Sequence, residues 1–253
     1  MHRIVILGTG TSGLAAALRL ATSARRSEVE ITLIEAKHQP GGRTRSYLDP
    51  ETGDTLDNGQ HLLMGCYSAT QDYMKLIGTS ELVSHSRGLS IPFALFNEYS
   101  GTTRIAHFKT KNYLPAPLHA LAGLRATDLL TAEEKFAAMR FSAKVSKLLS
   151  SPETAKLTCT ELFQKLRQPS GLIRKLWEPL TLATLNARCD EASALPLLSV
   201  LKLALLGKRS GATFLYPKVG LSELLISPAV EQLKSLGVTF EFRRPITKIH
   251  EIL

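Results

Sequence analysis

Apolar residues near the start of the chain form a short continuous run, Ile4 to Leu7, which is followed directly by the turn sequence GTGTSG. An unbroken apolar run of this length is typical of a buried parallel strand. The Ala- and Leu-rich segment LAAALRLATSA then predicts a helix, and Glu30 to Ile34 predict a second strand. Strand, glycine turn, helix and strand in this order predict a βαβ unit and an α/β fold.

The pattern of apolar residues changes after residue 82. SIPFALF and TTRIAHF alternate as strands do, while LPAPLHALAGL predicts an apolar loop or a short helix. The segment from Thr131 to Leu149 predicts a helix, and Thr131 and Glu134 have the spacing of a capping box. The segment from 160 to 207 is mostly apolar at helical spacing. We therefore expect a largely helical inserted domain over 83–212.

The remainder of the chain returns to the α/β pattern. Pro50, Gly53 and Asp54 predict a hairpin turn, and a helix from Tyr67 to Ile77 is expected to end at Gly78. Further along, the patterns predict a helix that begins within 219–224, an alternating strand at 238–242 and another strand over 245–252. The expected α/β domain is therefore discontinuous, with its first part over 1–82 and its returning part over 213–253.

Each glycine of the first turn has a separate physical role in a dinucleotide site. Gly8 permits the tight turn, Gly10 lets a pyrophosphate approach the backbone, and Gly13 lets the helix pack closely on the strand. Free amides at the start of the helix then hold the phosphates. Glu35 follows Gly13 by 22 residues, where an acidic side chain accepts hydrogen bonds from a ribose. The alternative is a tight turn in an α/β domain without a ligand.

A second glycine turn, GGRTR, begins six residues beyond Glu35. Gly41 and Gly42 allow another close approach of backbone to a ligand, and Arg43 carries a fork-shaped donor for phosphate oxygens. This second turn favours a flavin over a nicotinamide cofactor.

The formal net charge of +9 and the pI of about 9.6 suggest an anionic partner. The basic residues form no dense block, which argues against nucleic acid. Basic pairs near apolar stretches favour the surface of an anionic membrane, and a solvated basic surface without a partner is the alternative. No apolar stretch reaches the ~20 residues of a spanning helix, and GTGTSG interrupts what would otherwise resemble a signal peptide.

The three cysteines, Cys66, Cys159 and Cys189, are widely spaced and form no Cys/His cluster. This arrangement indicates a reducing compartment and no metal site. We therefore expect a cytoplasmic protein with peripheral contact to the cytoplasmic face of a membrane.

The pairing of an N-terminal GxGxxG with E-x5-GGR resembles the FAD-dependent amine oxidases, phytoene desaturases and their relatives, which bind FAD in this βαβ unit. The resemblance implies a Rossmann-like FAD-binding domain. The residues that it assigns to the cofactor in this unit are Gly8, Gly10, Thr11, Ser12, Gly13, Glu35, Ala36, Gly42 and Arg43.

Two further segments acquire a role through the resemblance. TLDNGQHLLMG matches a segment that runs beside the flavin ring, so Gly59, Gln60 and His61 are expected to face the flavin. The returning strand passes the adenosine end of the cofactor in this family, which makes Ile246 a further expected contact. A polar loop with a helix cap is the alternative for the first segment.

The stretch LWEPLTLATLNARCDEASA, together with DPETGDTLDNGQH and LPAPLHAL, resembles the squalene-associated FAD-dependent desaturases of hopanoid synthesis, described as hydroxysqualene dehydroxylases. The family implies reduction of hydroxysqualene, a long isoprenoid, to squalene. Arg188 and Cys189 depart from its pattern. Trp177 and Glu178 either line the pocket or serve as a core Trp and a helix-terminal acid.

Removal of a hydroxyl needs an acid. His61 is the first candidate because its ordinary pKa is near neutrality, while Asp57 or Glu178 would serve only if burial raised theirs. Alternatives for the activity are oxidation by a desaturase or an amine oxidase, or an inactive fragment or partner subunit. The family continues well beyond residue 253, so the C-terminal part of its fold is expected to be missing.

Overall fold

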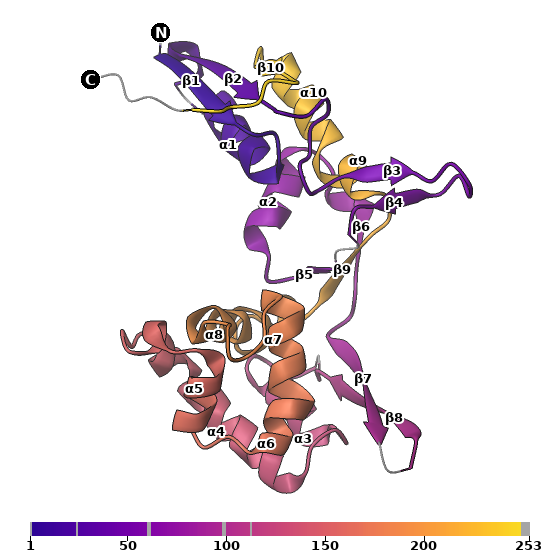
Figure 1. Ribbon diagram of the computed structural model, residues 1–253, viewed down its shortest axis with the longest axis vertical. Helices are drawn as coiled ribbons and strands as arrows, with labels where there is room; N and C mark the ends of the chain where they lie inside the picture. The colour runs from indigo at the N-terminus through magenta and orange to yellow at the C-terminus, as the bar shows by residue number, and fades with distance from the viewer. Residues whose placement is uncertain (1, 24, 60–61, 98–99, 112, 249–253) are drawn as a thin grey trace. The chain divides into compact units, whose positions relative to one another are not determined.

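The computed structural model describes residues 2–23, 25–59, 62–97, 100–111 and 113–248 of the 253. The chain forms two compact units, which are coloured by sequence in Figure 1. The α/β unit contains Met1–Leu63, Tyr67–Ser84 and Leu215–Leu253, and the helical unit contains Met64–Cys66 and His85–Phe214.

The α/β unit is built on a parallel sheet in the order β1-β2-β10, from β1 (His2–Leu7), β2 (Val29–Ile34) and β10 (Thr239–Glu241). The helix α1 (Thr11–Ala21) follows β1, so the expected βαβ unit is confirmed. The strand expected at 238–242 is also confirmed, because β10 pairs with β2.

The strand β1 is not buried in the way that its apolar run predicted. Its exposure alternates, and Val5 and Leu7 are 53% and 47% exposed. The reason is that one face of β1 is packed within the described residues, whereas the opposite face, which carries Val5 and Leu7, is exposed. One face of β1 packs towards α1, so that a Cβ built on Gly13 would meet the side chain of Ile6 at 3.5 Å.

The core of the α/β unit joins α1 to three other helices, α2 (Ser68–Leu76), α9 (Leu221–Leu225) and α10 (Ser227–Ser235). Tyr73 of α2 is buried and donates to the Leu225 carbonyl at 2.7 Å, and burial raises the pKa of its hydroxyl. Gly78, with φ of 75°, ends the segment after α2 as expected.

The expected hairpin is formed by β3 (Ser46–Leu48) and β4 (Thr55–Asp57), which pair antiparallel. A second small sheet has the order β5-β9-β6, from β5 (Leu63–Met64), β9 (Phe214–Pro217) and β6 (Val83–His85). Two 3₁₀ turns, Arg26–Glu28 and Ser80–Leu82, precede β2 and β6.

The strand expected over 245–252 is absent from the described part of that segment, since residues 245–248 are irregular. Arg243, two residues before this segment, has φ of 59°, a left-handed conformation that interrupts extended backbone. The amides of Arg243 and Arg244 then donate to the carbonyls of Lys37 and Glu35 at 3.0 and 2.9 Å. The chain therefore turns towards the end of β2 instead of continuing β10.

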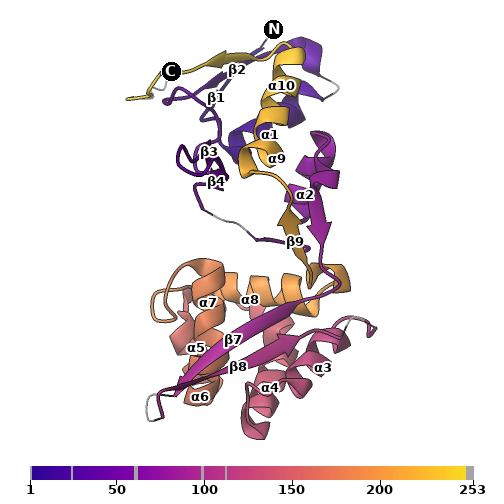
Figure 2. The same ribbon diagram turned by 90° about the vertical axis from the view of Figure 1, so that its right-hand side faces the viewer.

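The helical unit opens with the antiparallel hairpin of β7 (Ser90–Asn97) and β8 (Thr102–Lys109), which lies along one side of the helices in Figure 2. Its helices are α3 (Leu118–Ala126), α4 (Ala132–Leu149), α5 (Cys159–Lys165), α6 (Ser170–Leu172), α7 (Glu178–Leu185) and α8 (Ala194–Leu201). A π-helical turn, Ile173–Trp177, joins α6 to α7, and another, Lys202–Leu206, extends α8. Short 3₁₀ turns occur at Thr154–Lys156 and Arg209–Gly211.

Local sequence explains where the long helices begin. Thr131 accepts from the Glu134 amide at 3.3 Å, and the Glu134 side chain accepts from the Thr131 amide at 2.8 Å. The capping box expected at this helix is therefore confirmed, and α5 begins with an equivalent box of Thr158 and Glu161. None of the helices in the described ranges combines the length and the apolar character that crossing a membrane requires.

His119 of α3 is fully buried, and neither of its ring nitrogens has a hydrogen-bond partner among the described residues. Burial lowers the pKa of His119; the nearby Pro115 carbonyl opposes this effect, the positive charge of Arg209 adds to it, and the pKa remains below its ordinary value. Because the pKa is lower in the folded chain, the unfolded chain takes up the proton first as the pH falls. Stability is therefore lost as the pH drops below the unfolded value of about 6.5.

We expect His119→Leu to reduce this acid sensitivity, since an apolar side chain of similar volume removes the titrating group. Urea unfolding at pH 7.5 and 5.5 measures the effect. The parent should lose more stability between these values than the variant, and His107→Gln, a change at an exposed histidine of β8, controls for histidine removal in general. Equal losses in the parent and in His119→Leu would contradict the prediction.

Candidate functional site

The first glycine turn connects β1 to α1 through two constrained glycines. Gly8 has φ of 93°, and its amide donates to the Ile34 carbonyl at 2.8 Å. A Cβ on Gly13 would lie 2.1 Å from the Gly8 carbonyl oxygen, so close packing excludes any side chain there. Gly10 differs, because a Cβ there would meet nothing nearer than the Gly41 oxygen at 4.0 Å. The space beside Gly10 is therefore open.

The N-terminus of α1 has no side-chain cap and no acidic residue in its first turn. Its first intrahelical bond runs from the Leu14 amide to the Gly10 carbonyl at 3.0 Å, so the helix itself does not use the amides of Thr11, Ser12 and Gly13. In α4 and α5 the capping box satisfies the amide at the position of Gly13, which α1 leaves without a side-chain partner. Uncapped amides at a helix N-terminus form a binding site for an anion.

Glu35 follows β2 and is buried at the end of the sheet next to Gly8. Its Oε2 accepts from the Thr9 amide at 3.0 Å and the Thr9 hydroxyl at 2.7 Å, and its Oε1 accepts from the Lys37 amide at 3.0 Å. Burial acts to raise the pKa of Glu35, but these hydrogen bonds hold it below its ordinary value. The carboxylate therefore stays ionised, and an ionised carboxylate accepts hydrogen bonds from hydroxyl groups.

The second glycine turn packs directly on the first. The Gly41 amide donates to the Thr9 carbonyl at 3.0 Å, and Gly41 has φ of 112°. Gly42 has φ of 59°, and a Cβ there would lie 3.6 Å from the Cα of Gly10. The Thr11 and Thr44 hydroxyls are 3.2 Å apart. Residues 8–13, 35 and 41–44 therefore form one cluster around the start of α1.

Sequence reasoning missed the contributions of Thr9 and Thr44 to this cluster. Both residues lie inside the glycine-rich turns that the motifs identified, but a motif does not indicate that Thr9 binds Glu35 or that Thr44 pairs with Thr11.

The other expected contacts are less constrained. Ala36 and Arg43 are exposed beside the cluster, and the Arg43 carbonyl accepts from the Asn58 side chain at 3.4 Å. Gly59 is exposed directly after Asn58. Gln60 and His61 lie outside the described residues. Ile246 is 43% exposed, and it follows Arg244, whose amide binds the Glu35 carbonyl.

Asp57, one of the candidate acids, has a structural contact at the end of β4. Its Oδ1 accepts from the Ser46 hydroxyl at 2.6 Å and from the Leu221 amide at 2.9 Å. Ser46 and Ser222 also bind each other through both amide–hydroxyl pairs, at 2.8 and 2.9 Å. Asp57 therefore caps α9 and joins it to the hairpin.

Trp177 belongs to the core of the helical unit. It is buried, stacks on Phe163 with ring centroids 6.0 Å apart, and donates from Nε1 to the Gln168 oxygen at 3.2 Å. Glu178 is the first residue of α7. The interpretation of these two residues as a core Trp and a helix-terminal acid therefore fits the structure.

The described residues show neither a metal site nor a buried thiol suited to act as a nucleophile. Those residues contain no group of three or more His, Cys, Asp or Glu that could hold a metal ion. Cys159 and Cys189 are buried, and burial raises the pKa of both thiols, that of Cys159 to about 12. A thiol with so high a pKa is a poor nucleophile.

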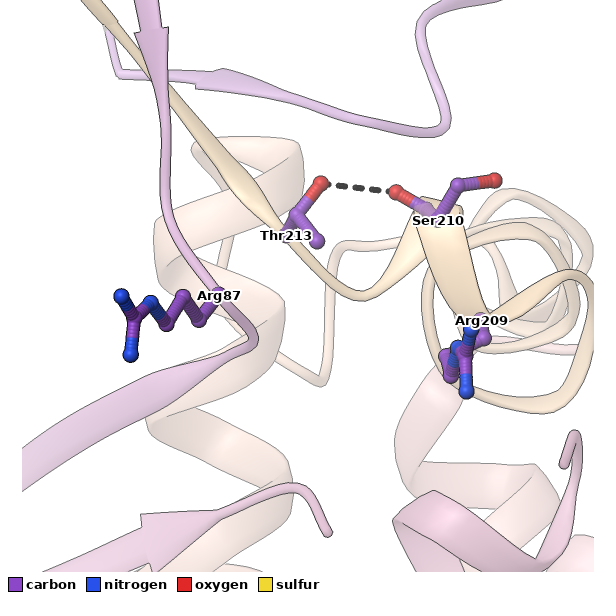
Figure 3. Close-up of a pocket in the computed structure, with 4 residues that line it drawn as sticks. All are labelled: Arg87, Arg209, Ser210 and Thr213. Atoms are coloured by element: carbon purple, nitrogen blue, oxygen red, sulfur yellow. Dashed lines mark hydrogen bonds between the residues drawn. The ribbon is translucent and has the colours of Figure 1, made fainter. Parts of the chain in front are cut away.

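A cavity of about 470 Å³ in the helical unit was not anticipated from the sequence. Arg87, Arg209, Ser210 and Thr213 line it, and Figure 3 shows the two arginines extending from separate segments. The Thr213 hydroxyl donates to the Ser210 carbonyl at 2.7 Å. The lining residues come from loops and a 3₁₀ turn, which carry no sequence periodicity.

Glu35→Ala should weaken flavin binding by roughly 10-fold or more, because a hydrogen bond to a charged group contributes about 1.5–3 kcal/mol. Glu30→Ala is the matched control, since Glu30 is an acid of β2, the strand that Glu35 follows, and its exposed side chain pairs with Arg3. Flavin fluorescence during titration measures both affinities. Equal affinities of the two variants would contradict the role assigned to Glu35.

Comparison with known proteins agrees with this geometry. The family model described as flavin containing amine oxidoreductase matches residues 11–251. A hydroxysqualene dehydroxylase of Rhodopseudomonas palustris is 32% identical over 240 residues, which are 94% of this chain and 52% of that protein. A zeta-carotene desaturase of Synechocystis is 25% identical over 98% of this chain and 50% of its own length.

Solved structures share the fold. An oxidoreductase from Methanosarcina mazei superposes with a TM-score of 0.64 at 16% identity, covering 96% of this chain and 51% of its own. Cyclohexylamine oxidase from Brevibacterium oxydans gives a TM-score of 0.62 at 17% identity, with the same coverage. The chain spans about half the length of the relatives that it matches.

The cluster around α1 is suited to FAD. The open space at Gly10 and the uncapped amides accommodate a pyrophosphate, and the ionised Glu35 can accept from a ribose hydroxyl. The described site and the family match therefore agree, and this chain belongs to the flavin containing amine oxidoreductases, with FAD as its cofactor.

Proposed function

We propose that this chain carries the FAD-binding and substrate-binding elements of an oxidoreductase that removes the hydroxyl group of hydroxysqualene to give squalene. The observation that carries the proposal is the similarity to hydroxysqualene dehydroxylases of three bacteria, which extends over 94–97% of this chain. The family model also matches residues 11–251, which include the second glycine turn and the WEPL stretch.

The residues have distinct roles in this proposal. The amides at 11–13 hold the pyrophosphate beside Gly10, Arg43 approaches it from the second turn, and Glu35 fixes the adenosine ribose. Ala36 and Gly42 complete this part of the site, and Ile246 contacts the adenosine end. Residues 1–82 and 213–253 thereby form the FAD-binding domain, and residues 83–212 form the substrate domain.

Reduced FAD supplies a hydride for the reaction. Departure of hydroxide from an allylic alcohol leaves a delocalised cation, so the chain must protonate the departing oxygen and shield the cation from water. Gly59 and Gln60 are assigned to the flavin surface, and His61 is assigned as the acid. Asp57 is less suited, since its Oδ1 already accepts two hydrogen bonds.

A single-turnover reaction tests the function. The protein is loaded with FAD, reduced chemically without oxygen in deuterium oxide, and mixed with hydroxysqualene. Squalene with deuterium at the former carbinol carbon is expected, and unlabelled squalene would exclude hydride capture from the flavin. Bound FAD without any turnover would favour a partner subunit or an inactive fragment.

The oxidative direction is the second candidate, and it is favoured by the similarity to zeta-carotene desaturase over nearly the whole chain. The same protein with oxidised FAD distinguishes it. New double bonds in squalene or in a carotene would overturn the reductive assignment.

We further propose peripheral contact with an anionic membrane, where a long isoprenoid is dissolved. Two groups of exposed apolar residues in the helical unit lie in basic sequence. Tyr113 and Leu118 are 79% and 51% exposed and follow Lys109 and Lys111, and the exposed Leu203 lies between Lys202 and Lys208. Apolar side chains flanked by Lys suit an anionic bilayer surface.

The double variant Lys109→Glu, Lys208→Glu should bind anionic liposomes at least about 30-fold more weakly, because each basic residue near such a surface contributes about 1 kcal/mol and the new carboxylates are repelled. Lys156→Glu, Lys234→Glu is the control, since it changes the net charge equally at exposed positions outside these two stretches of sequence. Flotation with anionic and neutral vesicles measures binding. Equal losses in the two double variants would show that net charge, not this surface, attracts the protein.

A further inference from the structure

The cavity of about 470 Å³ in the helical unit is lined by cationic and hydroxyl-bearing side chains. Arg87 lies between β6 and β7, and Thr213 directly precedes β9. Arg209 and Ser210 belong to one 3₁₀ turn. Figure 3 draws the two arginines on separate segments, with Thr213 between them. No carboxylate lines this cavity among the described residues, so its two positive charges favour an anionic ligand. We call it the arginine cavity.

The sequence around both arginines contains no acid. No Asp or Glu occurs over 82–97 or over 192–222, whereas the second range contains Lys202, Lys208 and Lys218 in addition to Arg209. Within the described ranges, Arg87 takes part in no ion pair and its side chain forms no hydrogen bond. Neighbours in the sequence therefore do not neutralise the positive charge at the arginine cavity.

Backbone packing fixes the segments that carry the arginines. Next to Arg87, the Ser86 amide donates to the Phe214 carbonyl, and the Phe214 amide donates to the Ser86 hydroxyl, both at 2.8 Å. The 3₁₀ turn packs so closely on Gly65 that a Cβ there would lie 1.9 Å from the Ser210 carbonyl oxygen. Segments held in this way lose little conformational entropy when a ligand binds.

The lining donors match a phosphate monoester better than a carboxylate. A phosphate monoester carries a charge of about −1.5 to −2 at pH 7 and three strong acceptor oxygens. A guanidinium group has a planar fork of donors that fits two of these oxygens. The Ser210 hydroxyl is a further donor, whereas the Thr213 hydroxyl already donates to the Ser210 carbonyl. Two arginines and one hydroxyl thus suit a doubly charged, three-oxygen group.

The arginine cavity belongs to the part of the helical unit assigned to the membrane. The exposed Leu203 and Lys208 precede Arg209 in the sequence. Burial lowers the pKa of His119, and the charge of Arg209 adds to this effect, so Arg209 is near enough to act on the start of α3. Leu118, which is also exposed, is the first residue of that helix. A ligand at the surface of an anionic membrane would therefore be within reach of Arg209.

We infer that the arginine cavity binds a phosphate monoester, supplied either by the headgroup of phosphatidic acid or by free phosphate. The inference deepens the membrane contact proposed above, and it rests on that proposal only for the lipid as the source of the phosphate. It is independent of the reaction at the flavin.

The experiment titrates the FAD-loaded protein in a calorimeter, because bound FAD fills the anion site at the start of α1. The probes are inorganic phosphate, water-soluble dihexanoyl phosphatidic acid and dihexanoyl phosphatidylcholine, a phosphate diester. We expect phosphatidic acid to bind about tenfold more weakly to Arg87→Gln and to Arg209→Gln than to the parent, because each loses a charge-assisted hydrogen bond. Arg174→Gln, a change at an exposed arginine that does not line the cavity, should bind as the parent does. A thermal melt verifies that the variants are folded.

The outcomes separate the cavity from the membrane contact. Parental binding of phosphatidic acid in both Arg87→Gln and Arg209→Gln, or an equal loss in Arg174→Gln, would overturn the inference. Inorganic phosphate bound as tightly as phosphatidic acid would support the site and assign it to free phosphate. A parent that floats with anionic vesicles but binds neither phosphate compound would overturn the cavity alone. Binding of phosphatidic acid by a parent that does not float would support the cavity and overturn the membrane contact.

Discussion

Gly13→Ala should lower the free energy of unfolding of the α/β unit by roughly 3 kcal/mol, whereas Gly10→Ala, which adds the same methyl group, should cost at most about 1 kcal/mol. At Gly13 the new Cβ would lie 2.1 Å from the Gly8 carbonyl oxygen, so β1 and α1 would have to separate. At Gly10 the nearest atom is 4.0 Å away, and the backbone has an ordinary extended conformation with φ of −68°.

For FAD affinity the order should be reversed: Gly10→Ala, which changes stability least, should lose the most affinity. The methyl group of Gly10→Ala occupies the open space beside the uncapped amides of α1, where the pyrophosphate is expected. We therefore expect at least a tenfold loss of FAD affinity in a protein that unfolds in urea almost as the parent does.

Urea unfolding of the FAD-free proteins and FAD titration of the folded ones measure the two quantities independently. If Gly10→Ala bound FAD as tightly as the parent, the pyrophosphate would not bind at this turn. Parental stability in Gly13→Ala would contradict the close packing of α1 on the Gly8 turn.

The sequence predicts the parts of the α/β unit that depend on local chemistry. The glycine turn, α1, β2 and the hairpin all follow from residue types at fixed spacing, and each is present. The exposure of β1 does not follow, because an apolar run gives no indication of how many faces of a strand are covered. The left-handed Arg243 that ends β10 is similarly invisible, since most residues with positive φ are glycine or asparagine.

In the candidate site, the sequence likewise did not predict individual contacts between residues. Spacing identified Glu35, but its partners Thr9 and Lys37 were found only from the fold. Asp57 had been considered for its acidity, while its hydrogen bonds to Ser46 and Leu221 join segments far apart in sequence. Periodicity and motifs specify which residue types are present, but tertiary packing decides which of them meet.

In the helical unit, too, some features could be predicted from the sequence and others could not. Its capping boxes have a local signature and were predicted at Thr131. The π-helical turns have none, because an i→i+5 hydrogen bond arises when packing on both sides of a helix requires an extra residue. The π-helical turns therefore belong to the features that only a structure reveals.

His61→Phe should slow the reduction of hydroxysqualene by ~10²-fold or more while leaving FAD bound, if His61 is the acid that protonates the departing hydroxyl. Phe keeps a planar ring of similar size in the segment assigned to the flavin but cannot give a proton. The measurement is the single-turnover rate with reduced FAD, together with the FAD content of the purified protein.

Asp57→Asn and Glu178→Gln are the matched controls, because each removes one alternative acid with little change of shape. Asp57→Asn should cost about 1 kcal/mol of stability through the cap of α9, yet retain the rate, since the Oδ1 that accepts from Leu221 and Ser46 serves the fold. Glu178→Gln should retain both. If His61→Phe keeps the parental rate and one of the controls loses much of it, the residue changed in that control is the acid. Parental rates in all three variants would show that none of these residues delivers the proton.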